Sequence, residues 1–396
     1  MNGEGNAWEA AVGCSRARQL FRGHFDSEPA GTWAAPGRVN LIGEHTDYNG
    51  GLCLPIALPH RTYVALRPRT DDVIRMVTDL PGTRIWTGTT DLVRPGAITG
   101  WPAYCSGPVW ALNQDGTDIG GFDVAAVSCV PVGAGLSSSA AIACSMVLAL
   151  AETAGRSADS DEERAALATL CVQAENEIAG APTGGMDQAA SLQARAGHAL
   201  LLDCRSGETR HIPFDLAGAG LTLLVVDTRA PHALVDGHYA ERRRTCENAA
   251  RQLGVASLRE VDDLPAAVRR LTDDLARRRV AHVVTEIDRV RRTVDHLTAR
   301  EWAQAGQLMN DSHRSLREDY EVSCRELDVV VDTAQQAGAL GARMTGGGFG
   351  GSAIVLAEEH AVEDIATAIQ DATRSRGLPE PRFHRVLAAD AATRIA

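Results

Sequence analysis

The stretch at residues 35–51 concentrates side chains that could bind a small polyhydroxylated molecule. It reads A-P-G-R-V-N-L-I-G-E-H-T-D-Y-N-G-G and carries Arg38, Glu44, His45 and Asp47. Sugar hydroxyls need both donors and acceptors, which guanidinium, imidazole and carboxylate groups supply together. An ordinary polar turn is the alternative, and turn chemistry accounts for Asp47 and its Asn and Gly neighbours. Because it does not account for the Arg, Glu and His, the stretch predicts a sugar pocket.

A second stretch, residues 131–141, could bind phosphate. It reads P-V-G-A-G-L-S-S-S-A-A, follows a strand-like run and leads directly into an apolar helix-like run. Free N–H groups at a helix start, with glycines that allow close approach, form an anion site without any lysine. Serine hydroxyls there can bond phosphate oxygens or ligate Mg²⁺. Serines that only cap the helix are the alternative, although one cap needs one serine. A dinucleotide fingerprint fits less well, because its third glycine is missing.

Two acids and a second glycine-rich loop are further candidates. Glu175 lies in a helix-like run, and Asp187 follows two glycines in T-G-G-M-D-Q, which predicts that Asp187 opens a helix. An acid at a helix start is often only a favourable partner of the helix dipole, so the local pattern leaves its function open. Residues 341–351 read G-A-R-M-T-G-G-G-F-G-G. Ordering so many glycines costs chain entropy, which is tolerated where the backbone folds tightly or touches a ligand. A flexible surface loop fits less well, because apolar strand-like runs flank this segment.

Composition limits the class of protein. The net charge of −12, without any basic block, argues against nucleic acid and anionic membrane as partners. All 39 basic residues are arginine, which excludes a Walker A loop, a protein-kinase strand lysine and a pyridoxal Schiff base. Nine scattered cysteines, no signal-peptide pattern and no membrane-length apolar run predict a soluble cytoplasmic protein. No obligate protein partner is evident.

The order of expected elements favours two domains. At 396 residues the chain is long for a single core. Strand-like and helix-like runs mix up to about residue 205, and a new buried strand is expected at 219–228. A helical block follows at 280–338, and the chain closes with a strand, a helix and a strand. We therefore expect an N-terminal domain at residues 1–205 and a C-terminal domain at residues 206–396.

Together, these separated motifs resemble the GHMP kinase superfamily and, within it, the galactokinase family. The first stretch resembles the galactokinase signature, residues 131–141 the superfamily's phosphate motif and residues 341–351 its C-terminal glycine motif. The order and spacing fit, so the resemblance covers essentially the whole chain. It implies the two-domain α+β fold of GHMP kinases, with an N-terminal domain like ribosomal protein S5, a ferredoxin-like C-terminal α/β domain and an active site in the cleft. It also implies ATP-dependent phosphorylation of the anomeric hydroxyl of galactose, with Mg²⁺ as cofactor.

The resemblance also implies roles for individual residues. Asp187 would be the catalytic acid residue that faces the anomeric hydroxyl, and Arg38 would lie beside it and the γ-phosphate. The residues expected to hold the sugar are Glu44, His45, Asp47, Gly184 and Tyr239. The residues expected to wrap the nucleotide phosphates are Gly133, Ala134, Gly135, Leu136, Ser137 and Ser138. Ser139 and Glu175 would hold Mg²⁺.

Two alternative functions stay open at this point. One is a non-catalytic galactose sensor on the same fold, whose known examples have a disrupted phosphate motif. Here the run S-S-S-A-A is whole and both Arg38 and Asp187 are present, which favours catalysis. The other is a superfamily kinase for a different small molecule, such as mevalonate or an N-acetylated sugar. The dense set of Glu44, His45 and Asp47 favours a free hexose over mevalonate.

Overall fold

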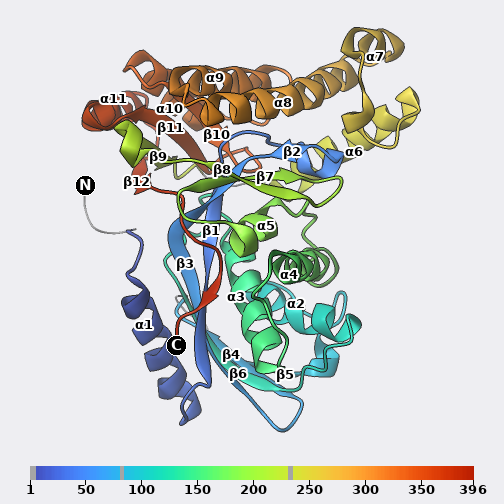
Figure 1. Ribbon diagram of the computed structural model, residues 1–396, viewed down its shortest axis with the longest axis vertical. Coiled ribbons are helices and arrows are strands. Elements are labelled where there is room, and N and C mark those ends of the chain that lie inside the picture. Colours follow the sequence, from blue (N-terminus) through green and yellow to red (C-terminus); the bar gives the residue numbers. More distant parts are fainter. Residues whose placement is uncertain (1–5, 81–83, 231–234) are drawn as a thin grey trace.

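The computed structural model describes residues 6–80, 84–230 and 235–396, which form mixed sheets with helices packed against them (Figure 1). The strands are β1 (Gly31–Asn40), β2 (Leu52–Cys53), β3 (Pro55–Pro68), β4 (Val73–Thr78), β5 (Trp86–Thr89), β6 (Phe122–Ser128), β7 (His198–Asp203), β8 (Thr209–Pro213), β9 (Leu221–Asp227), β10 (Gly341–Thr345), β11 (Ser352–Glu358), β12 (Arg382–Val386) and β13 (Thr393–Arg394). The helices are α1 (Ala10–Phe25), α2 (Trp101–Gln114), α3 (Ser138–Thr153), α4 (Asp161–Ala174), α5 (Met186–Gln193), α6 (Val235–Leu253), α7 (Leu264–Arg270), α8 (Asp274–Thr298), α9 (Trp302–Glu318), α10 (Arg325–Gln336) and α11 (Val362–Ser375).

The larger sheet, in the order β13-β1-β3-β6-β4-β5, is covered on both faces. Helix α1 lies on one face, and α2, α3 and α4 lie on the other (Figure 1). Successive residues of a strand point to opposite faces. Accordingly Trp33 packs with the α2–α4 cluster and its neighbour Ala34 with the α1 cluster. With both faces covered, β1 is buried along its whole length.

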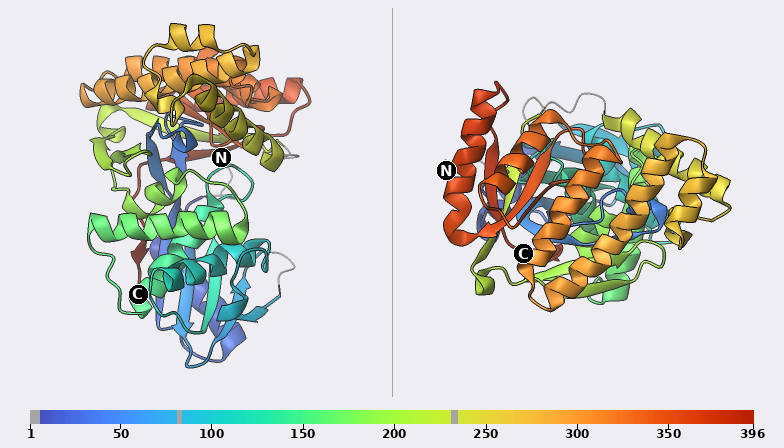
Figure 2. Two further views of the ribbon diagram at one scale, coloured as in Figure 1. Left: turned by 90° about the vertical axis from the view of Figure 1, so that its right-hand side faces the viewer. Right: turned by 90° about the horizontal axis from the view of Figure 1, so that it is seen from above.

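The second large sheet, in the order β10-β11-β9-β12, is antiparallel and carries the C-terminal helices as a separate layer (Figure 2). The small sheet β2-β7-β8 lies between the two. The last strand, β13, returns to the first sheet and pairs with β1. The predicted division between residues 205 and 206 falls between the paired strands β7 and β8, and the domain boundary stays a prediction. Within the described ranges, no helix is both apolar enough and long enough to span a bilayer.

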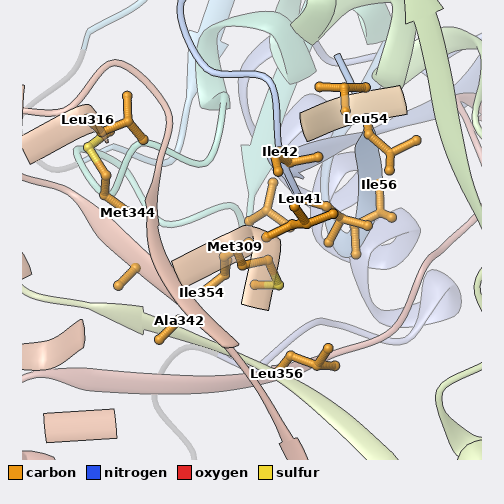
Figure 3. Packing of buried hydrophobic residues seen from close by; sticks show 14 of the residues in the cluster. Leu41, Ile42, Leu54, Ile56, Met309, Leu316, Ala342, Met344, Ile354 and Leu356 are labelled. Atoms are coloured by element: carbon orange, nitrogen blue, oxygen red, sulfur yellow. The ribbon is translucent and has the colours of Figure 1, made fainter. Parts of the chain in front are cut away.

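The apolar residues of the 35–51 stretch anchor it to the C-terminal layer. Leu41 and Ile42 belong to one buried cluster with Met309, Leu316 and Met344 (Figure 3). Burying a side chain of this size stabilises the fold by about 1.5–3 kcal/mol. The polar residues that alternate with these apolar ones are therefore held on a loop whose position is set by packing on both sides.

Candidate active site

The centre of the site is a hydrogen-bonded group of three side chains from three distant segments. Arg38 donates from Nε to Asp187 Oδ1 at 2.7 Å and from Nη2 to Asp187 Oδ2 at 2.8 Å. Ser137 donates its hydroxyl to Asp187 Oδ2 at 2.5 Å. Arg38 is only 6% exposed, so this charge-assisted pair lies largely out of water. An arginine, a carboxylate and a hydroxyl are thus fixed within one another's reach.

Local backbone geometry explains how these side chains meet. Asp187 is the second residue of α5, so the prediction that it opens a helix is confirmed. Arg38 donates its backbone N–H to the carbonyl of Leu136 at 3.1 Å, which ties β1 to the phosphate loop. A Cβ at Gly37 would lie 2.4 Å from the same carbonyl. A glycine is therefore required at Gly37 for β1 to approach the loop this closely.

The phosphate loop is shaped by residues with positive φ. Gly133, Gly135 and Ser137 have φ of 78°, 73° and 60°. Ser137 occupies the N-cap position of α3, but its side chain makes no cap hydrogen bond and bonds Asp187 instead. Capping therefore does not explain this serine. The loop also contacts the residue that follows the C-terminal glycine motif, because Ser352 donates its hydroxyl to the carbonyl of Ala134 at 2.7 Å.

A cavity of about 180 Å³ opens beside Asp187. Its lining includes seven of the residues proposed from the sequence: Arg38, Glu44, His45, Asp47, Glu175, Asp187 and Tyr239. Gly184 does not line it directly but packs against Asp47, where a Cβ would lie 2.2 Å from Asp47 Oδ2. Residues 133–139 lie outside this lining. The structure therefore brings the sugar set together and leaves the phosphate loop at its edge.

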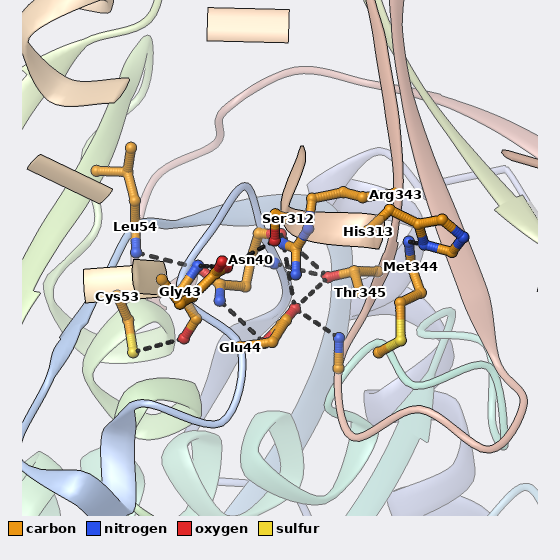
Figure 4. Close-up of polar contacts among 12 residues, drawn as sticks. Asn40, Gly43, Glu44, Cys53, Leu54, Ser312, His313, Arg343, Met344 and Thr345 are labelled. Carbon is orange, nitrogen blue, oxygen red and sulfur yellow. Dashed lines mark hydrogen bonds and ion pairs between the residues drawn. The ribbon is translucent and has the colours of Figure 1, made fainter. Parts of the chain in front are cut away.

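Glu44 is held by residues from two distant parts of the sequence (Figure 4). Its Oε1 accepts from the backbone N–H of Gly346 at 2.8 Å and from the Thr345 hydroxyl at 3.2 Å, and Oε2 accepts from Asn40 at 2.9 Å. The guanidinium of Arg343 lies 3.5 Å from Oε1. Glu44 therefore also joins the first motif to the second glycine loop, beyond any contact with a ligand.

A chain of polar contacts leads away from His45. His45 Nδ1 lies 2.9 Å from the Tyr48 hydroxyl, which lies 2.8 Å from the Tyr320 hydroxyl, and Cys246 Sγ follows at 3.1 Å. Burial and the neighbouring imidazole of α8 lower the pKa of His45 to about 3, so the ring is neutral. No hydrogen bond of ordinary geometry from the described residues reaches its buried Nε2, although the backbone of Gly347 lies near the ring. Sequence reasoning missed Tyr320, because nothing in its local pattern points to the pocket.

Helix α8 braces the same loop from behind. Glu286, fully buried, accepts from the backbone N–H of Gly43 at 3.0 Å and from Arg289 Nε at 2.6 Å, and a serine hydroxyl of α9 donates to it. His282 Nε2 lies 3.1 Å from the backbone carbonyl of Glu44. Burial opposes ionisation of Glu286, but nearby cationic groups, led by Arg289, outweigh it and lower the pKa to about 2. Sequence analysis missed this pair; its only signal was two polar residues four apart on the buried face of an amphipathic helix.

Two carboxyl groups of the cavity have raised pKa values. Burial, together with the charges of Asp187 and Glu44, raises the pKa of Asp47 to about 6. Burial and the charge of Asp187 raise the pKa of Glu175 to about 7. Glu175 accepts a hydrogen bond from Gln188 at 2.5 Å and another from Ser139. Crowded acids without dedicated cations are typical of sites completed by a ligand or a metal.

A larger, mostly apolar cavity of about 380 Å³ lies at the start of α3, on the other side of the serines. Ser138 and Ser139 line it, together with the aromatic rings of Trp101 and Tyr104 and the carboxyl group of Asp79. An aromatic-lined pocket beside a phosphate loop suits the base of a nucleotide. The sequence analysis did not find these aromatic residues, since they lie well before the phosphate motif in the chain.

Comparison with known proteins shows the family of this chain. The galactokinase galactose-binding signature matches residues 19–68, the GHMP kinase N-terminal domain residues 103–195 and the GHMP kinase C-terminal domain residues 293–374. A galactokinase of Streptomyces coelicolor is 48% identical over 391 residues, covering 98% of this chain and 99% of its own. The chain belongs to the galactokinase family. A human galactokinase is 42% identical, covering 90% of this chain and 91% of its own.

Solved structures confirm the expected GHMP kinase fold for this galactokinase-family chain. The galactokinase of Lactococcus lactis, solved in complex with galactose, superposes with a TM-score of 0.90 at 29% identity, covering 96% of this chain and 98% of its own. The mevalonate kinase of Methanococcus jannaschii superposes with a TM-score of 0.65 at 18% identity, covering 91% of this chain and 98% of its own. At that identity the second likeness shows the fold alone.

Proposed function

We propose that this protein transfers the γ-phosphoryl group of ATP to the anomeric hydroxyl of galactose, giving galactose 1-phosphate and ADP. The observation that carries the proposal is the group of Arg38, Ser137 and Asp187, which joins the cavity beside Asp187 to the phosphate loop. Galactose as the acceptor is supported by membership of the galactokinase family and by the galactose complex of the Lactococcus lactis relative.

The chemistry assigned to the chain is positioning and charge stabilisation, which phosphoryl transfer mainly requires. The Asp187 carboxylate would accept or attract the proton of the attacking hydroxyl. Arg38 orients that carboxylate through two parallel hydrogen bonds, and its guanidinium would stabilise charge on the transferred group. Ser137 supplies a third contact that fixes the same carboxylate.

Sugar binding is assigned to the loop that carries Glu44, His45 and Asp47, with Gly184 and Tyr239 completing the pocket. Asp47 would accept hydrogen bonds from ring hydroxyls, and the buried Nε2 of His45 would meet another. Gly184 acts by leaving room for Asp47, since any side chain there would displace its carboxylate.

Nucleotide binding is assigned to residues 133–138 for the phosphates and to the cavity of Trp101 and Tyr104 for the base. Mg²⁺ fits at Ser139 and Glu175, because Glu175 is a buried carboxyl group whose direct partners are neutral. Mg²⁺ commonly binds through one or two protein oxygens together with substrate phosphates, whose charge it neutralises when bound. We also assign the protein to the cytoplasm, where ATP is available; its nine free cysteines suit a reducing compartment.

A coupled ADP-release assay over a panel of acceptors tests the proposal. We expect rapid, Mg²⁺-dependent ADP release with galactose, and much slower release with glucose, N-acetylgalactosamine or mevalonate. Calorimetry with galactose runs in parallel. Saturable galactose binding without ADP release would instead support the sensor function, and faster turnover of another acceptor would overturn the substrate assignment.

A further inference from the structure

A cavity of about 460 Å³ lies apart from the sugar pocket, between the chain ahead of α1, the end of β6 and the start of β12. Its lining includes Trp8, Arg16, Cys129 and Arg382, none of which lines either cavity assigned to the substrates. Figure 1 shows the chain ahead of α1 rising toward β12. The N-terminal segment therefore forms one wall of this cavity.

Two arginines and an indole ring distinguish the lining of this cavity, and the carboxyl group of Asp79, whose charge interacts with that of Arg16, lies outside this lining. Arg16 stacks over the ring of Trp8, with its guanidinium carbon 4.3 Å from the ring centre. Neither Arg16 nor Arg382 makes a salt bridge with any residue in the described ranges, and no Asp or Glu lines the cavity there. By contrast, Arg69 and Arg75 both pair with Asp123. Both Arg16 and Arg382 are exposed, so the positive charge at this cavity is open to an incoming anion.

The lining indicates the chemistry of a ligand. Guanidinium groups bind phosphate through forked hydrogen bonds, and a phosphate monoester carries close to two negative charges at pH 7. The Trp8 ring offers a flat apolar surface beside this charge, against which the body of a small molecule can lie. We propose that this cavity is a second binding site, specific for a small organic phosphate monoester. The site stands independently of the proposed function; only a test with the reaction's own product rests on it.

The position of the cavity couples it to ATP rather than to the sugar. Cys129, Val130 and Pro131 form its inner wall and lead directly into the phosphate loop at residues 133–137. Ser128 lines both this cavity and the one assigned to the nucleotide base. A bound ester therefore changes the KM for ATP and leaves the KM for galactose nearly constant.

Calorimetry on the full chain tests the site. The cleft is first saturated with galactose and a non-hydrolysable ATP analogue. Galactose 1-phosphate, glycerol 3-phosphate and inorganic phosphate are then titrated separately, each up to about 5 mM, a limit that covers weak sites. The test variant is Arg16→Gln with Arg382→Gln. The matched control is Arg269→Gln with Arg270→Gln, which removes the same charge from two exposed arginines of α7.

We expect saturable binding of an ester to the wild type and the control, with at least tenfold weaker binding to the test variant and unchanged basal turnover. Tighter binding of galactose 1-phosphate than of glycerol 3-phosphate would identify feedback by the reaction product. Equal binding of the two esters would identify a response to phosphorylated metabolites in general. No ester binding, equal binding to the test variant, or binding of inorganic phosphate as tight as that of both esters would each overturn the proposal. Failure of the proposed function would appear separately, as absent ADP release by the wild type.

Discussion

Arg38 holds both carboxylate oxygens of Asp187, at 2.7 and 2.8 Å, across 149 positions of sequence. The pair joins strand β1 to the start of α5, with Ser137 of the phosphate loop as a third member. Because one oxygen of Asp187 also accepts from Ser137, the carboxylate is fixed in orientation before any ligand binds.

Asp187→Asn is expected to lower kcat by about 10²–10⁴-fold and to leave galactose binding mostly intact. The change keeps the size of the side chain but removes the charge that would attract the hydroxyl proton. Steady-state kinetics and galactose calorimetry measure the two effects. Ser137→Ala, which keeps the carboxylate and removes one of its partners, is expected to lose much less. Turnover of the Asn variant above about a third of wild type would contradict the role.

Arg38→Lys is expected to lower kcat by roughly 10³–10⁵-fold with little change in either KM, since a group that meets the transferring phosphoryl acts mainly in the transition state. Lysine keeps the charge and loses the fork that engages Asp187. The alternative is a purely structural ion pair. A lower melting temperature with nearly normal kcat would favour that alternative, so thermal melts accompany the kinetics.

Asp47→Ala is expected to raise the KM for galactose more than tenfold and to leave ATP binding unchanged, because a hydrogen bond to a charged group is worth about 1.5–3 kcal/mol. Calorimetry with each ligand measures the difference. Equal weakening of both ligands would indicate misfolding or a wrong pocket.

The raised pKa of Asp47 also predicts how the free energy of unfolding depends on pH. Its folded value of about 6 lies above the ordinary value of 3.8, so the folded state holds this proton longer than the unfolded state. The free energy of unfolding therefore falls as pH rises from about 4 to 6. Asp47→Asn should reduce the fall measured by melts at pH 5 and 8 without abolishing it, because the raised pKa of Glu175 contributes a fall of the same sign. An unchanged difference between the two pH values would show that Asp47 is not the group responsible.

Glu286→Gln is expected to raise the KM for galactose without changing that for ATP, since the carboxylate holds the backbone of Gly43. Its folded pKa of about 2 lies below the ordinary value of 4.5, so it stabilises the fold above that value and loses this effect as pH falls from about 4.5 to 2. Acid unfolding should therefore flatten over that window in the variant. Asp288→Asn, an exposed acid on the same helix, is the control. Equal losses in both variants would argue against a specific brace.

The apparent affinity for Mg²⁺ is expected to rise as pH increases through about 7. Glu175 must be ionised to bind the ion, and its pKa lies near that value. Activity titrated with Mg²⁺ at pH 6 and 8 measures this. Glu175→Gln should bind Mg²⁺ more weakly and without this pH dependence, whereas the exposed Glu177→Gln should behave as wild type. An identical pH dependence in the Glu175 variant would exclude Glu175 as the titrating ligand.

The motifs and their chemistry could be predicted from neighbouring residues alone. The clustering of Arg38, Glu44, His45 and Asp47 predicted a polar pocket, and the glycine–serine run predicted the loop that precedes α3. These features are local, because glycine spacing, helix starts and clusters of polar side chains each depend on residues that are close together in the sequence. The two-domain α+β fold was predicted from the resemblance to the family, and that resemblance rests on the same local motifs.

Which side chains meet, and which residues hold them in place, depends on how the chain folds. Tyr320, His282 and Glu286 come from segments far from the motif, and their local patterns are those of ordinary buried helices and turns. The local sequence also did not predict that the Ser137 side chain bonds Asp187 instead of capping helix α3. Contacts between distant segments depend on how apolar faces pack. The residues around one sequence position therefore do not identify the distant residue that it contacts in the fold.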